Sequence, residues 1–268
     1  MIPSRWLWHG VSLLCCSDYT ADRESLVYNS ERRYDFGMGF LLLEGGAEFG
    51  GRMRIPDVRA LDLAGGFDVP LRIVPTAAAP DGNHLRAGGN GVRWFESLGV
   101  RNVESVQVID KPSANDVTIA NSFRSAKLIY LLGGFTHYLG QTLKDSLAWQ
   151  VALEAYRNGA VIAGSSAGAM VMCEFYYDPY EGKIHEGLNL VSNSLVLPHH
   201  NTFGKGWAPR LLKQIPNVTL LGIDEQTGML NDAENGMWNV YGAGEVTVYR
   251  EGRVEAYKAG MTFSIVSP

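Results

Sequence analysis

Apolar runs and helical stretches follow each other in turn along this chain. Short apolar runs typical of buried strands lie at residues 40–43, 71–74, 105–109, 127–132, 160–163 and 218–223. Helix-like stretches lie at residues 58–64, 85–98, 114–124, 139–158 and 167–173. Because this alternation is typical of connected β-α units, it predicts an α/β fold with a mostly parallel sheet and helices on both faces.

The pattern changes near the C-terminus. Residues 237–241, 245–249 and 253–257 are short runs separated by glycines at positions 242, 244 and 252. Such spacing is typical of short antiparallel strands. We expect them to complete one edge of the sheet.

The strand predicted at residues 160–163 leads into Gly164-Ser165-Ser166-Ala167-Gly168, which has the form Gly-x-Ser-x-Gly. In a nucleophile elbow, a strained turn between strand and helix exposes the serine, and a Cβ in place of either glycine would collide with nearby backbone. Unpaired N–H groups in the first helical turn also favour negative charge there. Ser166 is therefore a candidate nucleophile. The alternative is a glycine-rich turn that only packs a helix against a strand.

The order of the histidines restricts the class of enzyme. An α/β-hydrolase has its catalytic histidine close to the C-terminus, and none of the six histidines follows His200. The apolar run that stops at Pro198 predicts a strand, which places His199 at the same edge of the sheet as Ser166. His199 is the favoured base and His200 the alternative. We expect His185, in a polar stretch, to be a solvated loop residue.

Two carboxylates, Asp224 and Glu225, follow the strand predicted at residues 218–223. A carboxylate fixed at a strand end can orient an imidazole and stabilise its cation. Because successive strand residues point to opposite faces, only one of the two can serve. The alternative is a strand end with two solvated acids.

In this order, these motifs resemble the serine-peptidase family that contains peptidase E (aspartyl dipeptidase) and cyanophycinase. The resemblance runs from about residue 40 to the C-terminus and includes residues 73–78, 95–99 and 131–139. It implies a class I glutamine-amidotransferase-like fold, with residues 37–268 as a single catalytic domain and residues 1–36 as an N-terminal extension. It also implies Ser166 as nucleophile, His199 as base and Glu225 as the orienting acid. The amides of Gly134 and Ala167 would form the oxyanion hole.

The same resemblance implies small peptide substrates with an acidic, Asp-type residue. Arg210 is the best candidate for its counter-charge, because the family carries Arg-Leu-Leu in the helix after its catalytic histidine. Lys205 is the second, and His200 is a further substrate-binding candidate. An ordinary surface charge is the alternative for Arg210.

The chain departs from the family pattern in three places. Phe135 follows Gly-Gly where the family commonly has Asn or Asp, which puts the polar contact made there in doubt. Leu197 and Pro198 stand where cyanophycinase has Asp-Gln, which argues against cyanophycin as the substrate. His200 replaces a residue that is usually aromatic.

Composition narrows the class of protein further. A formal net charge of −5 gives no electrostatic footprint for nucleic acid or an anionic membrane. No apolar run reaches the roughly 18 residues of a membrane span. Three cysteines, Cys15, Cys16 and Cys173, cannot form a disulfide framework, so a reducing cytoplasm is expected. No metal-binding spacing or dinucleotide fingerprint is present, and we expect no metal and no cofactor. The sequence leaves a homodimer open.

Two other functions remain alternatives. The first is an esterase or amidase of unrelated substrate that uses the same three residues. The second is a non-catalytic binding protein on the same fold, suggested by Phe135 and by the unmatched N-terminal extension. The favoured function is a serine peptidase that forms an acyl-enzyme.

Overall fold

The structure is a computed structural model that describes residues 38–265. The predicted N-terminal extension, with Cys15 and Cys16, lies outside these residues. The strands are β1 (Leu41–Glu44), β2 (Leu71–Val74), β3 (Val103–Ser105), β4 (Leu128–Leu131), β5 (Val161–Ser165), β6 (Phe175–Asp178), β7 (Lys183–Glu186), β8 (Ser194–Leu197), β9 (Thr219–Ile223), β10 (Thr227–Leu230), β11 (Trp238–Gly242), β12 (Glu245–Arg250), β13 (Arg253–Lys258) and β14 (Thr262–Phe263). The helices are η1 (Gly51–Met53), α2 (Arg54–Ala64), η2 (Thr76–Ala78), α3 (His84–Leu98), α4 (Lys111–Ala114), α5 (Val117–Asn121), α6 (Thr136–Leu143), α7 (Leu147–Arg157), α8 (Ala167–Met172), η3 (Gly204–Trp207), α9 (Ala208–Gln214) and η4 (Glu234–Gly236).

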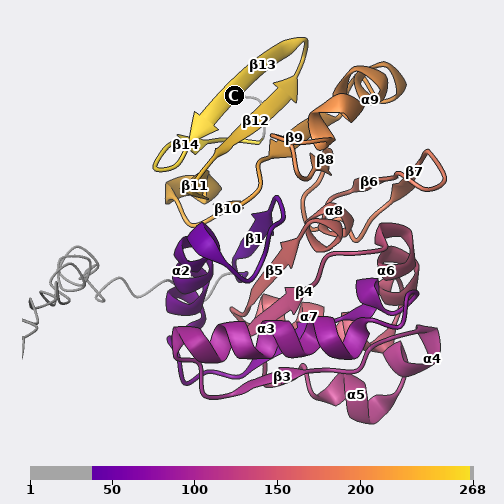
Figure 1. Ribbon diagram of the computed structural model, residues 1–268, viewed down its shortest axis with the longest axis vertical. Helices are drawn as coiled ribbons and strands as arrows, with labels where there is room; N and C mark the ends of the chain where they lie inside the picture. Colours follow the sequence, from indigo (N-terminus) through magenta and orange to yellow (C-terminus); the bar gives the residue numbers. More distant parts are fainter. Residues whose placement is uncertain (1–37, 266–268) are drawn as a thin grey trace, which may run out of the picture. The chain divides into compact units, whose positions relative to one another are not determined.

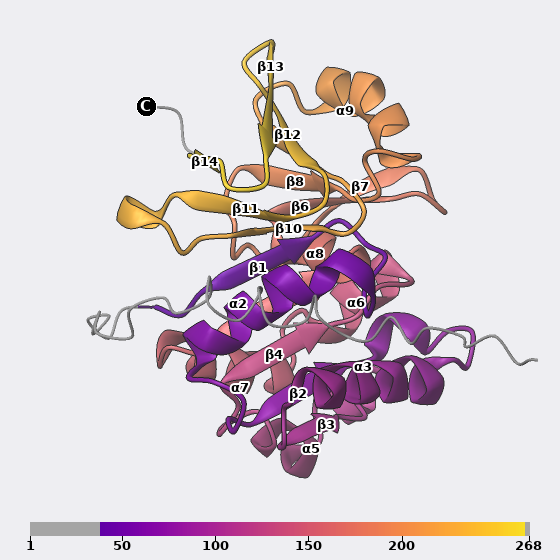
Figure 2. The same cartoon turned by 60° about the vertical axis from the view of Figure 1, so that its left-hand side comes forward.

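The main sheet has eight strands in the order β14-β11-β10-β1-β5-β4-β2-β3. Five neighbouring strands in this order, β1, β5, β4, β2 and β3, are parallel to one another. Strands β10, β11 and β14 add antiparallel pairs at the edge beside β1 (Figure 2). The predicted α/β class and mostly parallel sheet are therefore confirmed. Because the parallel strands share one direction, their carboxyl ends meet at one edge, where ligands bind in open α/β sheets.

Alternate residues of the parallel strands pack into two apolar cores, one on each face. Leu42, Ile73 and Tyr130 lie in the core under α2 and α3, with Leu61 and Phe95 of those helices. Their strand neighbours, such as Leu43, Val74 and Leu131, lie in the other core with α6, α7 and α8. Helix α3 crosses the near face in Figure 1. The continuous burial of β1, β2, β4 and β5 explains why they appear in the sequence as apolar runs.

A second sheet changes one part of the prediction. Strand β9 does not join the main sheet; it lies in a four-stranded sheet with the order β13-β12-β9-β8. Of the three predicted C-terminal strands, only β11 completes the main edge, and β12 and β13 extend the second sheet. Apolar periodicity marks a strand, but it does not identify its pairing partner.

Two predicted helices are each split into two. Residues 114–124 contain the end of α4 and the whole of α5, which begins after Asp116, whose side chain accepts from the N–H groups of Thr118 and Ile119. Residues 139–158 contain the end of α6, which begins at Thr136, and the whole of α7, which starts at a Ser146 cap. The polar stretch around His185, for which we expect a loop, contains strand β7, and the sequence pattern predicts neither β6 nor β10.

No helix within residues 38–265 is long and apolar enough to cross a membrane.

Candidate active site

Ser166 lies in a strained turn between β5 and α8. Its backbone has φ 49° and ψ −110°, which a residue with a side chain rarely adopts. A Cβ at Gly164 would lie 2.5 Å from the carbonyl carbon of Gly168, and a Cβ at Gly168 would lie 2.1 Å from the carbonyl oxygen of Leu131. Both glycines are therefore required by close backbone approach, as the elbow motif predicts.

Three predicted side chains meet at the carboxyl end of β5. The Oγ of Ser166 lies 3.1 Å from Nε2 of His199, and Nδ1 of His199 lies 2.8 Å from Oε1 of Glu225. His199 follows β8 and Glu225 follows β9, so the second sheet supplies both residues. A serine, an imidazole and a carboxylate in this chain of contacts can move a proton from the hydroxyl and stabilise the resulting imidazolium.

Backbone contacts hold the imidazole in place. The N–H of His199 donates to the carbonyl oxygen of Gly45 at 2.7 Å, and the ring stacks on Phe203 with centroids 4.8 Å apart. The N–H of Glu225 donates to Oδ1 of Asn201 at 3.0 Å. Because these contacts come from the loop after β1 and from the loop after β8, the ring orientation does not depend on Ser166 and Glu225 alone.

The two amides predicted as an oxyanion hole lie on either side of the elbow. Ala167 is the first residue of α8, and Gly134 belongs to the loop after β4. That loop is fixed because the N–H of Phe135 donates to the carbonyl oxygen of Ala77 at 2.8 Å. Within residues 38–265, neither amide N–H donates a hydrogen bond in the structure, so both are available to an oxyanion.

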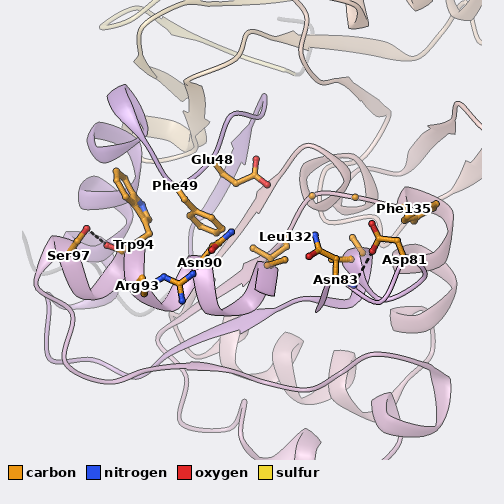
Figure 3. Close-up of a pocket in the computed structure, with 15 residues that line it drawn as sticks. Glu48, Phe49, Asp81, Asn83, Asn90, Arg93, Trp94, Ser97, Leu132 and Phe135 are labelled. Carbon is orange, nitrogen blue, oxygen red and sulfur yellow. Dashed lines mark hydrogen bonds between the residues drawn. The ribbon is translucent and has the colours of Figure 1, made fainter. Parts of the chain in front are cut away.

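A cavity of about 620 Å³ adjoins this loop. It is lined by the loop residues 132–135 and by Glu48, Phe49, Ala77, Ala78, Asp81, Asn83, Ala87, Asn90, Arg93, Trp94 and Ser97. Figure 3 shows Trp94 and Ser97 at one end, Phe135 and Asp81 at the other, and Glu48 between them. Two carboxylates, those of Glu48 and Asp81, and the guanidinium of Arg93 therefore line the cavity.

The neighbouring pair His200 and Asp224 lies away from this site. His200 is only 4% exposed, and its Nε2 lies 2.9 Å from the hydroxyl of Tyr249, while Asp224 lies 3.5 Å from its Nδ1. Burial lowers the pKa of His200, although the charge of Asp224 opposes this shift. The contacts of His200 are thus with Tyr249, Asp224 and Gly222, whereas the ring that reaches Ser166 is that of His199. Strand β8 ends at Leu197 and His199 has φ 49°, so the chain turns at these two residues, with the ring of His199 at Ser166 and the ring of His200 against Gly222 and Tyr249 of the second sheet.

The structure does not bring Arg210 to Ser166. The Arg210 guanidinium donates to the carbonyl oxygen of Gly182 at 2.6 Å and to the hydroxyl of Tyr177 at 3.3 Å, which ties α9 to the β6–β7 hairpin. Lys205 is exposed in η3 and close enough to His200 for its charge to lower the pKa of that histidine. Neither cation contacts Ser166, His199 or Glu225 in the structure.

The β6–β7 hairpin brings an aromatic ring to the loop after β4, which holds Gly134 and Phe135. Phe135 stacks on Tyr180 with centroids 5.2 Å apart. His185 is half-buried and lies 4.1 Å from the ring of His137, so the expectation of a solvated loop residue is wrong. The only signal for this hairpin in the sequence is the aromatic run at residues 175–177, which precedes the polar turn.

One group of side chains among the described residues has ligand atoms close enough to hold a metal ion. Asp178, Glu181 and His185 place these atoms within 4.8 Å of one another. Asp178 accepts from the N–H groups of Tyr180 and Glu181, and Glu181 pairs with Lys183. These contacts account for the group as part of the hairpin turn.

A buried pair of carboxyl groups lies behind the site and is not evident from the sequence. Glu44 and Asp57 are 0% and 1% exposed; Tyr130 donates to Glu44, and Nε1 of Trp94 donates to Asp57 at 2.7 Å. Burial and then the charge of Asp57 raise the pKa of Glu44 well above its usual range. Burial raises the pKa of Asp57 to about 7. Glu44 Oε1 and Asp57 Oδ1 have no hydrogen-bond partner in the described part of the chain, and the interaction between the two carboxyl groups raises the pKa of Glu44 and lowers that of Asp57, the pattern that one proton held between them would give.

Known proteins resemble this chain in sequence and fold. Cyanophycinase from Trichormus variabilis is 26% identical over 61% of this chain, and cyanophycinase from Synechococcus elongatus is 27% identical over 73%. These matches span 58% and 63% of the relatives' own length. A crystal structure of a peptidase from an acI-B1 actinobacterium superposes with a TM-score of 0.77 and 27% identity, over 85% of this chain and 97% of that one. A putative peptidase E from Listeria monocytogenes shares the fold, with a TM-score of 0.52 and 19% identity, over 84% of this chain and all of that one.

The sequence profile of peptidase family S51 matches residues 41–235, which is most of the chain and includes the elbow, both strand ends and the oxyanion loop. The resemblance found from the motifs is confirmed. The chain belongs to peptidase family S51, a family of serine-type peptidases.

Proposed function

We propose that this protein is a serine peptidase that hydrolyses small peptides through an acyl-enzyme on Ser166. The observation that supports it is the hydrogen-bonded chain of Ser166, His199 and Glu225 at the carboxyl end of the sheet. Family membership and the actinobacterial peptidase agree with this activity.

In the proposed reaction, Ser166 Oγ attacks the scissile carbonyl while Nε2 of His199 takes the hydroxyl proton. The amides of Ala167 and Gly134 stabilise the oxyanion of the tetrahedral intermediate. His199 then gives its proton to the leaving amine as the C–N bond breaks. Water attacks the resulting ester with His199 again as base, which releases the acid and restores Ser166. Glu225 holds the imidazole tautomer that has its proton on Nδ1.

Labelling with a fluorophosphonate tests the proposal directly. An activated Ser166 should react with the probe, Ser166→Ala should not, and Ser165→Ala should label nearly as the parent does. Ser166→Ala should also lose about 10³-fold or more in kcat on a cleaved peptide while keeping its fold. A parent protein that resists the probe would favour the non-catalytic binding protein. A panel of p-nitrophenyl esters beside acidic dipeptides would separate a peptidase from an esterase.

A finer proposal concerns the substrate. An acidic residue in the peptide would need a cation, and Arg210 and Lys205 are the candidates that the family resemblance supplies. In support, the Arg210 guanidinium lies against Tyr177, 5.6 Å from its ring centroid, on the hairpin that also carries Tyr180 beside the oxyanion loop. Its hydrogen bonds to that hairpin give it a competing structural role.

A further inference from the structure

Glu48 lies beside both the nucleophile and the oxyanion loop. It follows β1, and its Oε2 accepts a hydrogen bond from the hydroxyl of Ser165 at 3.0 Å. A Cβ built on Gly133 would lie 3.1 Å from Oε1 of Glu48 and 3.3 Å from Cβ of Ser166. One methyl-sized space thus separates this carboxylate from the side chain that would attack the substrate.

Among the described residues, the Glu48 carboxylate has no counter-charge. Within residues 38–265, no Lys, Arg or His lies within 4.0 Å of it, and the hydroxyl of Ser165 is the one donor that it meets. Glu48 is half-buried and lines the cavity of about 620 Å³ (Figure 3). A partly desolvated carboxylate without a cation is costly, and a ligand that brings one is bound more tightly.

The buried carboxyl groups of Glu44 and Asp57 lie within the electrostatic field of Glu48 and bring no cation to it. The charge of Glu48 contributes to the raised pKa of both, which shows that all three groups share one electrostatic field. The nearest cation that lines the cavity, Arg93, donates to Oδ1 of Asn90 and lies toward the Trp94 end in Figure 3. The part of the cavity beside Ser166 is therefore acidic.

We propose that Glu48 binds a positively charged group of the substrate next to the scissile bond. This inference rests on the proposed function, because it assumes that the scissile carbonyl reaches Ser166. In a peptide with a free N-terminus, the ammonium nitrogen is two bonds from the first carbonyl carbon, which suits a carboxylate this close to the nucleophile. A Lys or Arg side chain offers the same chemistry from farther along the cavity.

Glu48→Gln tests the proposal, because it keeps the acceptor for Ser165 and nearly the same volume but removes the charge. The substrates are aminocoumarin amides of Asp and of Lys. Each amide is tested in two forms, one with a free α-amino group and one with an acetylated α-amino group. We measure cleavage, and for uncleaved compounds we measure protection of Ser166 from a fluorophosphonate. Asp81→Asn is the matched control, since Asp81 lines the same cavity but accepts from the N–H of Asn83 in an exposed turn.

We expect Glu48→Gln to lower kcat/KM, or the protection constant, by about 10- to 150-fold for the compounds with the recognised cation. For the matching compounds that lack this cation, kcat/KM or the protection constant should change by about threefold or less. The same small change is expected for all compounds with Asp81→Asn. Selective loss on free-amine compounds identifies the ammonium group, and selective loss on Lys compounds identifies the side chain. Equal change on charged and neutral compounds, or no binding of either cation by the parent, overturns the proposal. Ser166 labelling in the parent and in Glu48→Gln separates this failure from failure of the proposed function.

Discussion

Replacing Asp57 with Asn should reduce the loss of stability that this fold suffers as the pH rises. Asp57 is buried with Glu44 and accepts from Trp94 at 2.7 Å, and burial raises its pKa from 3.8 to about 7. Between these values the folded protein holds a proton that the unfolded chain has released. Unfolding therefore releases a proton, and stability falls as the pH rises through this window.

The magnitude follows from the two pKa values. The whole window corresponds to about 4 kcal/mol, at about 1.36 kcal/mol for each pH unit. An experiment between pH 5 and pH 8 covers only the upper part of this pH window, and Glu44 takes part in the same titration. We therefore expect the free energy of unfolding to fall by about 2–3 kcal/mol over this range. Asn keeps both neighbours satisfied, because its oxygen can accept from Trp94 and its amide can donate to the Glu44 oxygen that has no other partner.

The assay is urea unfolding of the parent and of Asp57→Asn at pH 5, 6, 7 and 8, followed by tryptophan fluorescence and circular dichroism. The free energy of unfolding of the parent should fall relative to the variant as the pH rises. Asp68→Asn is the control, since Asp68 is exposed and pairs with an exposed Arg101, and it should leave the pH dependence unchanged. If parent and Asp57→Asn keep the same pH dependence, the buried pair does not share a proton as described.

The remaining predictions concern the candidate site. His199→Ala should abolish hydrolysis, measured as kcat. His200→Ala should mainly lower the melting temperature, because the His200 ring fills the space against Gly222 and Tyr249. The reverse ranking would identify His200 as the base. Glu225→Gln should reduce kcat by failing to hold the imidazole tautomer, whereas Asp224→Asn should act on stability through the N–H of Glu245; equal kinetic effects would reject Glu225 as the orienting acid. Arg210→Met should lower kcat/KM for an Asp-containing dipeptide by about 10- to 150-fold and spare a neutral analogue if Arg210 binds the acid. Equal losses on both peptides would make it a structural link to the hairpin.

The sequence was sufficient for the parts of the fold that have local signals. Strands β1, β2, β4 and β5 are buried on both faces, and the elbow glycines are required by backbone contact, so both leave a mark in the sequence. The pairing of strands leaves no such local signal, and for this reason the sequence pattern places β9 in the wrong sheet. The partners of Glu44 come from the distant residues 57 and 130, and Glu48 becomes notable only when the loop after β4 lies beside it.

The dependence of the site on two sheets leads to a final prediction at Gly46. The loop after β1 in the main sheet meets both residues that the second sheet supplies, since Gly45 accepts from the N–H of His199 and Gly46 accepts from the N–H of Gln226, next to Glu225. Gly46 has φ 120°, and a Cβ there would lie 2.3 Å from Cε1 of His199. Gly46→Ala should therefore push the imidazole away from Ser166 and strain the loop by about 1–3 kcal/mol. We expect kcat to fall by about 10²-fold or more while the protein stays folded.

Circular dichroism would measure the folding of Gly46→Ala, and fluorophosphonate labelling would measure the reactivity of Ser166. Gly206→Ala is the control, because a Cβ there meets nothing within 4 Å. A folded Gly46→Ala variant that labels and turns over like the parent would show that the imidazole does not need this contact to face Ser166.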